Sequence, residues 1–107
     1  MPPWLLLALA IFTEVVGTVA LKESDGFTRL VPALLVVVGY GLSFVFLALT
    51  LRHIPLGVTY AIWAGAGTAA IALIGIVALG EAATAVKIAS LALIIAGVVG
   101  LNLSGAH

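Results

Sequence analysis

The chain has 107 residues, of which 64% are hydrophobic and 7% are charged, and its formal net charge at pH 7 is zero. This composition excludes an ordinary soluble domain and a basic surface for nucleic acid, and the absence of cysteine excludes disulfides, thiolate metal sites and a cysteine nucleophile. Because a helix needs about 20 residues to cross the membrane, the length predicts an all-α membrane protein: a compact bundle of four transmembrane helices in one domain, residues 1–107, with no soluble domain.

The first expected helix, residues 4–21, carries a single charged side chain, the carboxylate of Glu14. A charged group at the centre of a membrane helix costs about 2.5–3.5 kcal/mol, so an intramembrane carboxylate is a functional candidate. Ala10, Gly17 and Thr18 lie at i−4, i+3 and i+4 from Glu14 and predict a small, partly polar face that points inward rather than to lipid. Since a carboxyl can carry a proton or balance a cation but not both, we expect Glu14 to bind the two in turn.

The second expected helix, residues 30–51, contains no charged residue and places Tyr40 and Ser43 on one face. Taken alone, an aromatic ring and a hydroxyl among aliphatic side chains are typical of ordinary packing. Together with an inward-facing carboxylate, they become candidate contacts for a substrate or a proton.

The third expected helix, residues 58–79, begins with two aromatic side chains one turn apart, Tyr60 and Trp63. Tyr60 fits equally well as part of an aromatic belt at the membrane interface and as part of the wall of a binding site. Trp63 lies one turn deeper, which favours the second interpretation for that residue. Aromatic faces and one carboxylate predict a site for a flat or bulky organic cation, because cation–π attraction strengthens once water is excluded. Gly65 and Gly67 allow another backbone to approach or the helix to bend.

The fourth expected helix, residues 84–103, is rich in small side chains, a pattern that favours helix association in lipid. The candidate residues of a dimer interface are Ser90, Leu93, Ile94 and Gly97. One four-helix unit offers little volume for a substrate, so we expect a homodimer that shares two copies of Glu14.

Neither histidine has a second ligand at metal-binding spacing, since His53 falls in a short loop and His107 is the last residue of the sequence. A serine–histidine–acid arrangement cannot be placed on one helix face. We therefore expect no metal, no cofactor and no enzymatic activity.

The basic residues divide weakly between the two sides of the membrane, with Lys22, Arg29 and Lys87 opposite Arg52 and the terminal amine. Such a small positive-inside bias is compatible with insertion in both orientations. The N-terminal segment lacks a cationic leader, so we expect the first helix to be retained rather than cleaved as a signal peptide.

Three motifs resemble those of the small multidrug resistance transporters. They are residues 13–18 (Thr-Glu-Val-Val-Gly-Thr), residues 26–29 (Gly-Phe-Thr-Arg) after Lys22, and residues 60–67 (Tyr-Ala-Ile-Trp-Ala-Gly-Ala-Gly). The resemblance covers essentially the whole chain. It implies an antiparallel, dual-topology homodimer in a bacterial inner membrane that exports cationic compounds in exchange for protons.

The resemblance also implies roles for individual residues. Both copies of Glu14 would form one shared site for substrate and protons, lined by Tyr40, Tyr60 and Trp63, and the third helix would bend at its paired glycines. Two positions depart from the family pattern: Ala64 stands where a serine is common, and Ser90 stands where a glycine is common. The first departure removes a hydrogen bond near the site, whereas the second keeps a small side chain at the dimer interface.

Within this family, multidrug exporters must be separated from guanidinium exporters, which resemble each other in fold and in the central glutamate. Guanidinium-type members tend to carry a tryptophan near position 17, whereas Gly17 leaves room here and Tyr40 offers a ring for stacking. The favoured function is therefore alternating-access antiport of quaternary ammonium and similar hydrophobic cations against protons. The alternatives are guanidinium export and, from a different class, a proton-translocating ring or assembly subunit, which would need no aromatic residues around its carboxylate.

Overall fold

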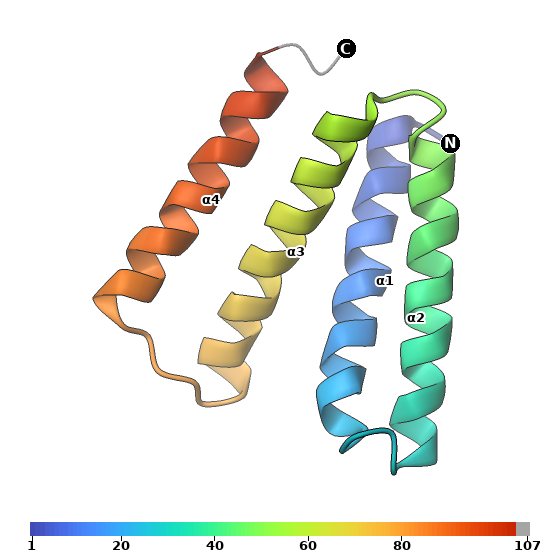
Figure 1. The fold of residues 1–107 in the computed structure, drawn as a ribbon, viewed down its shortest axis with the longest axis vertical. Helices are drawn as coiled ribbons and strands as arrows, with labels where there is room; N and C mark the ends of the chain where they lie inside the picture. The colour runs from blue at the N-terminus through green and yellow to red at the C-terminus, as the bar shows by residue number, and fades with distance from the viewer. Residues whose placement is uncertain (105–107) are drawn as a thin grey trace. The chain divides into compact units, whose positions relative to one another are not determined.

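The computed structural model describes residues 1–104, and these residues form four α-helices without a strand among them. The helices are α1 (Pro3–Glu23), α2 (Leu30–Thr50), α3 (Leu56–Ala78) and α4 (Ala85–Leu103), as Figure 1 shows. Each is long and apolar enough to cross a membrane. The prediction of an all-α protein with four membrane-spanning helices is confirmed.

The helix ends lie close to the expected limits, and the differences have local causes. The α1 helix begins at Pro3, because a proline in the first turn gives up an N–H that has no intrahelical acceptor. Similarly, α3 begins at Leu56, directly after Pro55. The α4 helix begins one residue later than expected because Thr84 caps it, its Oγ1 accepting a hydrogen bond from the Lys87 N–H at 3.1 Å.

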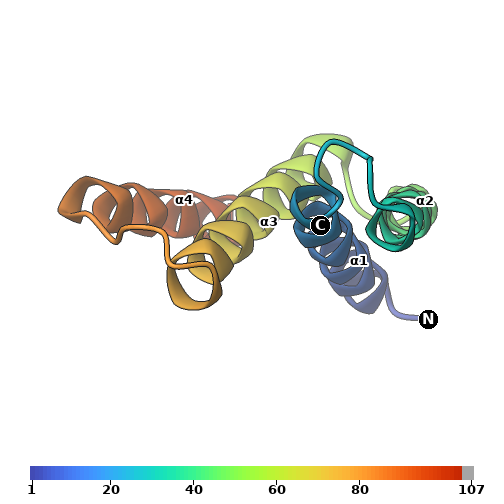
Figure 2. The ribbon, with the colours of Figure 1, turned by 90° about the horizontal axis from the view of Figure 1, so that it is seen from below.

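The chain forms two compact units, Met1–Ile54 and the segment from Pro55 onward. In the first unit α1 packs against α2, and in the second α3 packs against α4, each pair joined by a short loop. Figure 2 shows each pair from below. Each pair is an antiparallel helical hairpin. A single membrane domain built from both hairpins stays a prediction.

The first hairpin is held together by a close approach of two helix backbones. A Cβ placed on Gly39 of α2 would lie 2.9 Å from the carbonyl oxygen of Thr13 and 3.0 Å from the Cα of Gly17. Gly17 and Gly39 are both buried. Glycine is thus required at this crossing, where the absence of side chains brings the polar face of α1 against α2.

The loop between α1 and α2 is organised by the buried side chain of Ser24. Its hydroxyl donates to the carbonyl oxygen of Leu21 at 2.7 Å and accepts a hydrogen bond from the N–H of Phe27 at 3.1 Å. Asp25, Gly26 and Phe27 all have positive φ, at 48°, 68° and 67°. Hydrogen bonds to Ser24 therefore hold a left-handed turn that only its glycine adopts without steric cost.

The second hairpin has less internal burial than the first. A close helix contact joins Gly65 of α3 to α4, where a Cβ on Gly65 would meet the Cγ2 atoms of Val98 and Ile94. No residue of α4 is buried. Because α4 is also apolar enough to span a membrane, its exposed surface is suited to lipid or to another helix.

Candidate functional site

Five of the predicted site residues of the first hairpin lie along one stripe on the face where α1 meets α2. Ala10, Glu14 and Thr18 are spaced four residues apart on α1, which places them one above another. Ser43 and Tyr40 of α2 meet the two ends of this stripe through hydrogen bonds to Ala10 and Thr18. The structure therefore brings these five predicted site residues together.

Glu14 lies on the half-buried part of this stripe and is hydrogen-bonded through one carboxylate oxygen. The hydroxyl of Thr18 donates to Oε1 of Glu14 at 2.8 Å, and the oxygen of Thr18 lies 2.8 Å from the hydroxyl oxygen of Tyr40. The second carboxylate oxygen, Oε2, is buried and has no hydrogen-bond partner among the described residues. One oxygen is thus held by the protein, while the other makes no hydrogen bond within the described residues; a role of Oε2 in ligand binding stays a prediction.

The ring of Tyr40 packs directly over Gly17. A Cβ on Gly17 would lie 2.9 Å from Cδ1 and 3.0 Å from Cε1 of Tyr40. The missing side chain at position 17 is therefore the space that Tyr40 occupies, and it allows the tyrosine hydroxyl to reach Thr18. The space beside Gly17 is thus taken up by the ring of Tyr40, and room for a substrate at this position stays a prediction.

Ser43 links the two helices at the other end of the stripe. This residue is fully buried, and its hydroxyl donates to the backbone carbonyl oxygen of Ala10 at 2.7 Å. The hydroxyl proton is therefore engaged in packing α2 against α1. A contact of Ser43 or Ala10 with a substrate stays a prediction.

Tyr60 and Trp63 form an aromatic pair on α3, in the second hairpin. Their ring centroids are 5.7 Å apart with planes tilted by 58°, within the range of favourable aromatic contacts. The side chain of Tyr60 is 58% exposed, whereas Trp63 is half-buried. The two rings form one surface within their own hairpin, and a site that combines them with Glu14 stays a prediction.

The paired glycines of α3 and the interface residues of α4 occupy different surroundings. The α3 helix is continuous through Gly65 and Gly67, and Gly65 serves the close contact with Ile94 and Val98 of α4. A bend at these glycines stays a prediction. On α4, Ser90, Leu93 and Gly97 are exposed, Leu93 at 74%, whereas Ile94 lies toward Gly65 at the contact with α3.

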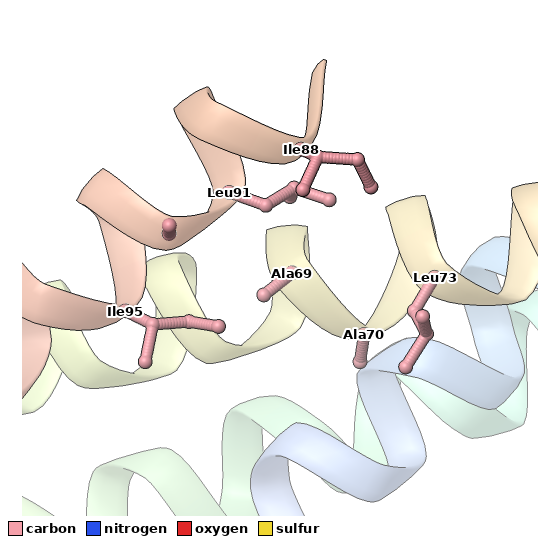
Figure 3. A pocket seen from close by; sticks show the side chains of 7 residues that line it. Ala69, Ala70, Leu73, Ile88, Leu91 and Ile95 are labelled. Carbon is pink, nitrogen blue, oxygen red and sulfur yellow. The ribbon is translucent and has the colours of Figure 1, made fainter. Parts of the chain in front are cut away.

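An apolar groove of about 370 Å³ lies between α3 and α4, and Figure 3 shows the side chains around it. It is lined by Ala69, Ala70, Leu73, Ile88, Leu91, Ala92 and Ile95. None of these side chains is polar, so the groove offers no group that could balance a charge. It does not contain any residue of the predicted binding site.

The histidines and carboxylates do not form a metal site in the part of the chain that is described. No group of three histidine, cysteine or acidic side chains lies close enough together there to hold an ion. His53 is exposed in the loop between the hairpins, and His107 lies outside the described residues.

Gly39 is the residue at this site that the sequence interpretation missed. It is the position where α2 touches the α1 backbone. This close approach brings Tyr40 and Ser43 of the same helix near the stripe that contains Glu14. A sequence signal exists, because Gly39 and Ser43 are two small residues four apart, the spacing typical of close helix contacts in membranes.

Comparisons with known proteins find similar sequences that match nearly the whole chain. The model of the family described as Small Multidrug Resistance protein matches residues 2–94. The quaternary ammonium compound-resistance protein QacF of Klebsiella aerogenes is 48% identical over 103 residues, covering 96% of this chain and 94% of the relative. The multidrug resistance protein mmr of Mycobacterium bovis is 48% identical over 105 residues, covering 97% and 98%. The resistance protein QacC of Staphylococcus aureus is 42% identical over 103 residues, covering 96% of each chain.

Proposed function

The chain belongs to the small multidrug resistance family, and from that premise we propose that it exports hydrophobic organic cations, quaternary ammonium compounds among them, in exchange for protons. Members of this family are multi-pass membrane transport and resistance proteins and not enzymes, and the relatives come from bacteria, where such a protein resides in the inner membrane. The specific proposal is that one carboxylate, Glu14, binds cation and proton alternately.

The observation that carries this proposal is the buried Oε2 of Glu14, which has no hydrogen-bond partner among the described residues and belongs to a helix apolar enough to span a membrane. An ionised carboxylate in hydrocarbon is costly unless a positive charge or a proton satisfies it. A quaternary ammonium ion supplies the charge without needing hydrogen-bond acceptors of its own. A proton removes the charge and with it the attraction that retains the cation.

Transport follows from this exchange when the site opens alternately to the two sides of the membrane. A cation enters from the cytoplasmic side when Glu14 is ionised, and a proton arriving from the outside displaces it. Each net elementary charge that moves gains or loses about 2.3 kcal/mol per 100 mV of membrane potential. Because proton entry displaces the cation, the proton gradient drives export against the concentration gradient of the cation.

The transporter acts as an antiparallel homodimer in this proposal. One chain supplies a single intramembrane carboxylate, and a second copy in the opposite orientation supplies another to the same site. Support comes from the exposed, small-residue surface of α4 around Ser90 and Gly97, and from the weak asymmetry of the basic residues. Tyr60 and Trp63 supply aromatic faces for the cation.

The test is binding of tetraphenylphosphonium to the purified protein across pH. This probe keeps its charge at all pH values, so a change in binding reports the protein alone. Binding should rise with pH, because ionised Glu14 attracts the cation, and Glu14→Gln should abolish it. The matched control is Glu81→Gln, which removes a carboxylate outside the four helices and should leave binding unchanged.

Transport should be measured with the same variants in liposomes that carry a pH gradient. Proton-driven efflux of the cation is expected for the native chain and for Glu81→Gln, but not for Glu14→Gln. Efflux retained by Glu14→Gln would contradict the proposal. Binding of guanidinium alone would favour the guanidinium exporter, and binding of neither cation would favour a proton-conducting assembly.

A further inference from the structure

The two oxygens of the Glu14 carboxylate have different surroundings. The number of hydroxyl protons available fixes the direction of the hydrogen bonds that lead to Oε1. A threonine hydroxyl has one proton to donate, and Thr18 donates it to Oε1 of Glu14. The contact of 2.8 Å between Thr18 and Tyr40 must then use the proton of Tyr40, with Thr18 as the acceptor. The hydrogen bonds therefore run in one direction, from Tyr40 to Thr18 to Glu14.

We infer that Thr18 is the residue that positions the Glu14 carboxylate for exchange, and that the hydroxyl of Tyr40 acts on Glu14 through Thr18 rather than by contacting the cation. This inference rests on the proposed function and assigns separate tasks to the two carboxylate oxygens. Oε1 is fixed by the hydrogen bond from Thr18, and Oε2 exchanges a proton for a cation. A proton that leaves Oε2 passes to water on the side to which the site is open.

Thr18 and Tyr40 stabilise the ionised form of the carboxylate in this arrangement. A hydrogen bond from a hydroxyl to a charged oxygen is stronger than one between neutral groups, and a second donor behind the first polarises it further. Removing the hydroxyl of Thr18 leaves Oε1 without this donor. The ionised site is then less stable, so a higher pH is needed before the cation binds.

The charges around the site do not supply another source for such a pH response. Between Leu30 and Thr50, α2 carries Tyr40 as its only titratable side chain. On α1 the next titratable residues after Glu14 are Lys22 and Glu23, at the end of the helix. The titratable side chains of the other two helices are Tyr60 on α3 and Lys87 on α4. Glu14 is therefore the carboxyl within the apolar spans that can couple proton and cation binding.

The experiment is a double-mutant cycle with Thr18→Val and Tyr40→Phe, read as the pH midpoint of tetraphenylphosphonium binding and as the affinity on the high-pH plateau. Thr18→Val should raise the midpoint by about one pH unit, equivalent to about tenfold weaker binding at a fixed pH below it. Tyr40→Phe should raise the midpoint by less. In the Thr18→Val background, Tyr40→Phe should cause no further shift, because the acceptor of its hydrogen bond is already lost.

Thr18→Ser is the matched control, since it keeps the hydroxyl and removes a methyl group, and it should retain the native midpoint. Helix content and the mass of the assembly, measured for every variant, identify a variant that has lost its fold. The inference is overturned if Thr18→Ser shifts the midpoint as far as Thr18→Val does. It is also overturned if the two single effects add, or if Tyr40→Phe weakens the plateau affinity, which would place the tyrosine hydroxyl on the cation.

Failure of this inference differs from failure of the proposed function. If Glu14→Gln binds the probe with the pH profile of the native chain, the antiport proposal itself is wrong. If Glu14→Gln loses binding while the cycle is additive, the antiport proposal stands and only the role of Thr18 is wrong.

Discussion

The ring of Tyr40 lies directly on Gly17, so closely that a Cβ at position 17 would come within 2.9 Å of the ring. The same tyrosine reaches the hydroxyl of Thr18 at 2.8 Å. The absence of one side chain on α1 thus places the hydroxyl of α2 within reach of the group that holds Glu14. The absence of a side chain at position 17 therefore leaves space for the ring of Tyr40. It also permits the hydrogen bonds around the Glu14 carboxylate.

Gly17→Ala is therefore expected to displace Tyr40 and to weaken the binding of hydrophobic cations at low pH, in the same direction as Tyr40→Phe. Overpacking of a tight contact costs about 1–3 kcal/mol. Here we expect both a lower free energy of unfolding and a displaced Tyr40 ring. The measurement is the pH profile of tetraphenylphosphonium binding. In a Tyr40→Ala background the added methyl group meets no ring, so Gly17→Ala should then have little effect, and an equal effect in both backgrounds would contradict this account.

The sequence was sufficient to predict the four helices, whereas the role of Glu14 stays a prediction. Charged residues occur at the ends of the apolar stretches, so the four spans can be located without a structure. A single carboxylate within one of these spans is a functional candidate, because a charged group in lipid is energetically costly. Helical spacing also places Ala10 and Thr18 on the face of Glu14.

The partners of Thr18 could not be predicted in the same way. Helical spacing gives the face of one helix, whereas the bond between Thr18 and Tyr40 depends on how α2 is rotated and how closely it approaches. That approach is set by Gly39 against the backbone of α1, a contact between residues distant in sequence. For Ser43 the residue type suggested a site role, but only the structure shows its bond to the Ala10 carbonyl.

Gly39→Ala should destabilise the first hairpin, because the new Cβ would meet backbone atoms that cannot rotate away. It would lie 2.9 Å from the Thr13 carbonyl oxygen and 3.0 Å from the Cα of Gly17. A loss of about 1–3 kcal/mol in the free energy of unfolding is expected, measured by denaturation in mixed micelles. Gly41→Ala is the control on the same helix, since a Cβ on Gly41 has no neighbour within 4 Å. Equal losses for the two variants would refute the close crossing.

Ser43→Ala should weaken the contact between α1 and α2 by removing the hydrogen bond to the Ala10 carbonyl oxygen. Hydrogen bonds between membrane helices contribute about 0.6 kcal/mol on average and up to about 1.7 kcal/mol, so a loss of this size is expected in the same unfolding measurement. Thr13→Ala provides the comparison, because its hydroxyl donates within α1, to Leu9 at 2.8 Å. If Thr13→Ala costs as much as Ser43→Ala, the bond between the helices contributes no particular stability.

Gly97→Leu should reduce dimer formation without disturbing the fold of the second hairpin. Within one chain a Cβ on Gly97 has no neighbour within 4 Å, so a larger side chain is accommodated by the monomer. In a dimer formed through α4, the same side chain would separate two closely packed helices. The dimer fraction in bilayers should therefore fall, while the helix content stays native. Gly41→Leu, at an equally open position on α2, is the control and should leave the dimer fraction unchanged. A native dimer fraction for Gly97→Leu would mean that α4 pairs through another face or that the assembly forms elsewhere.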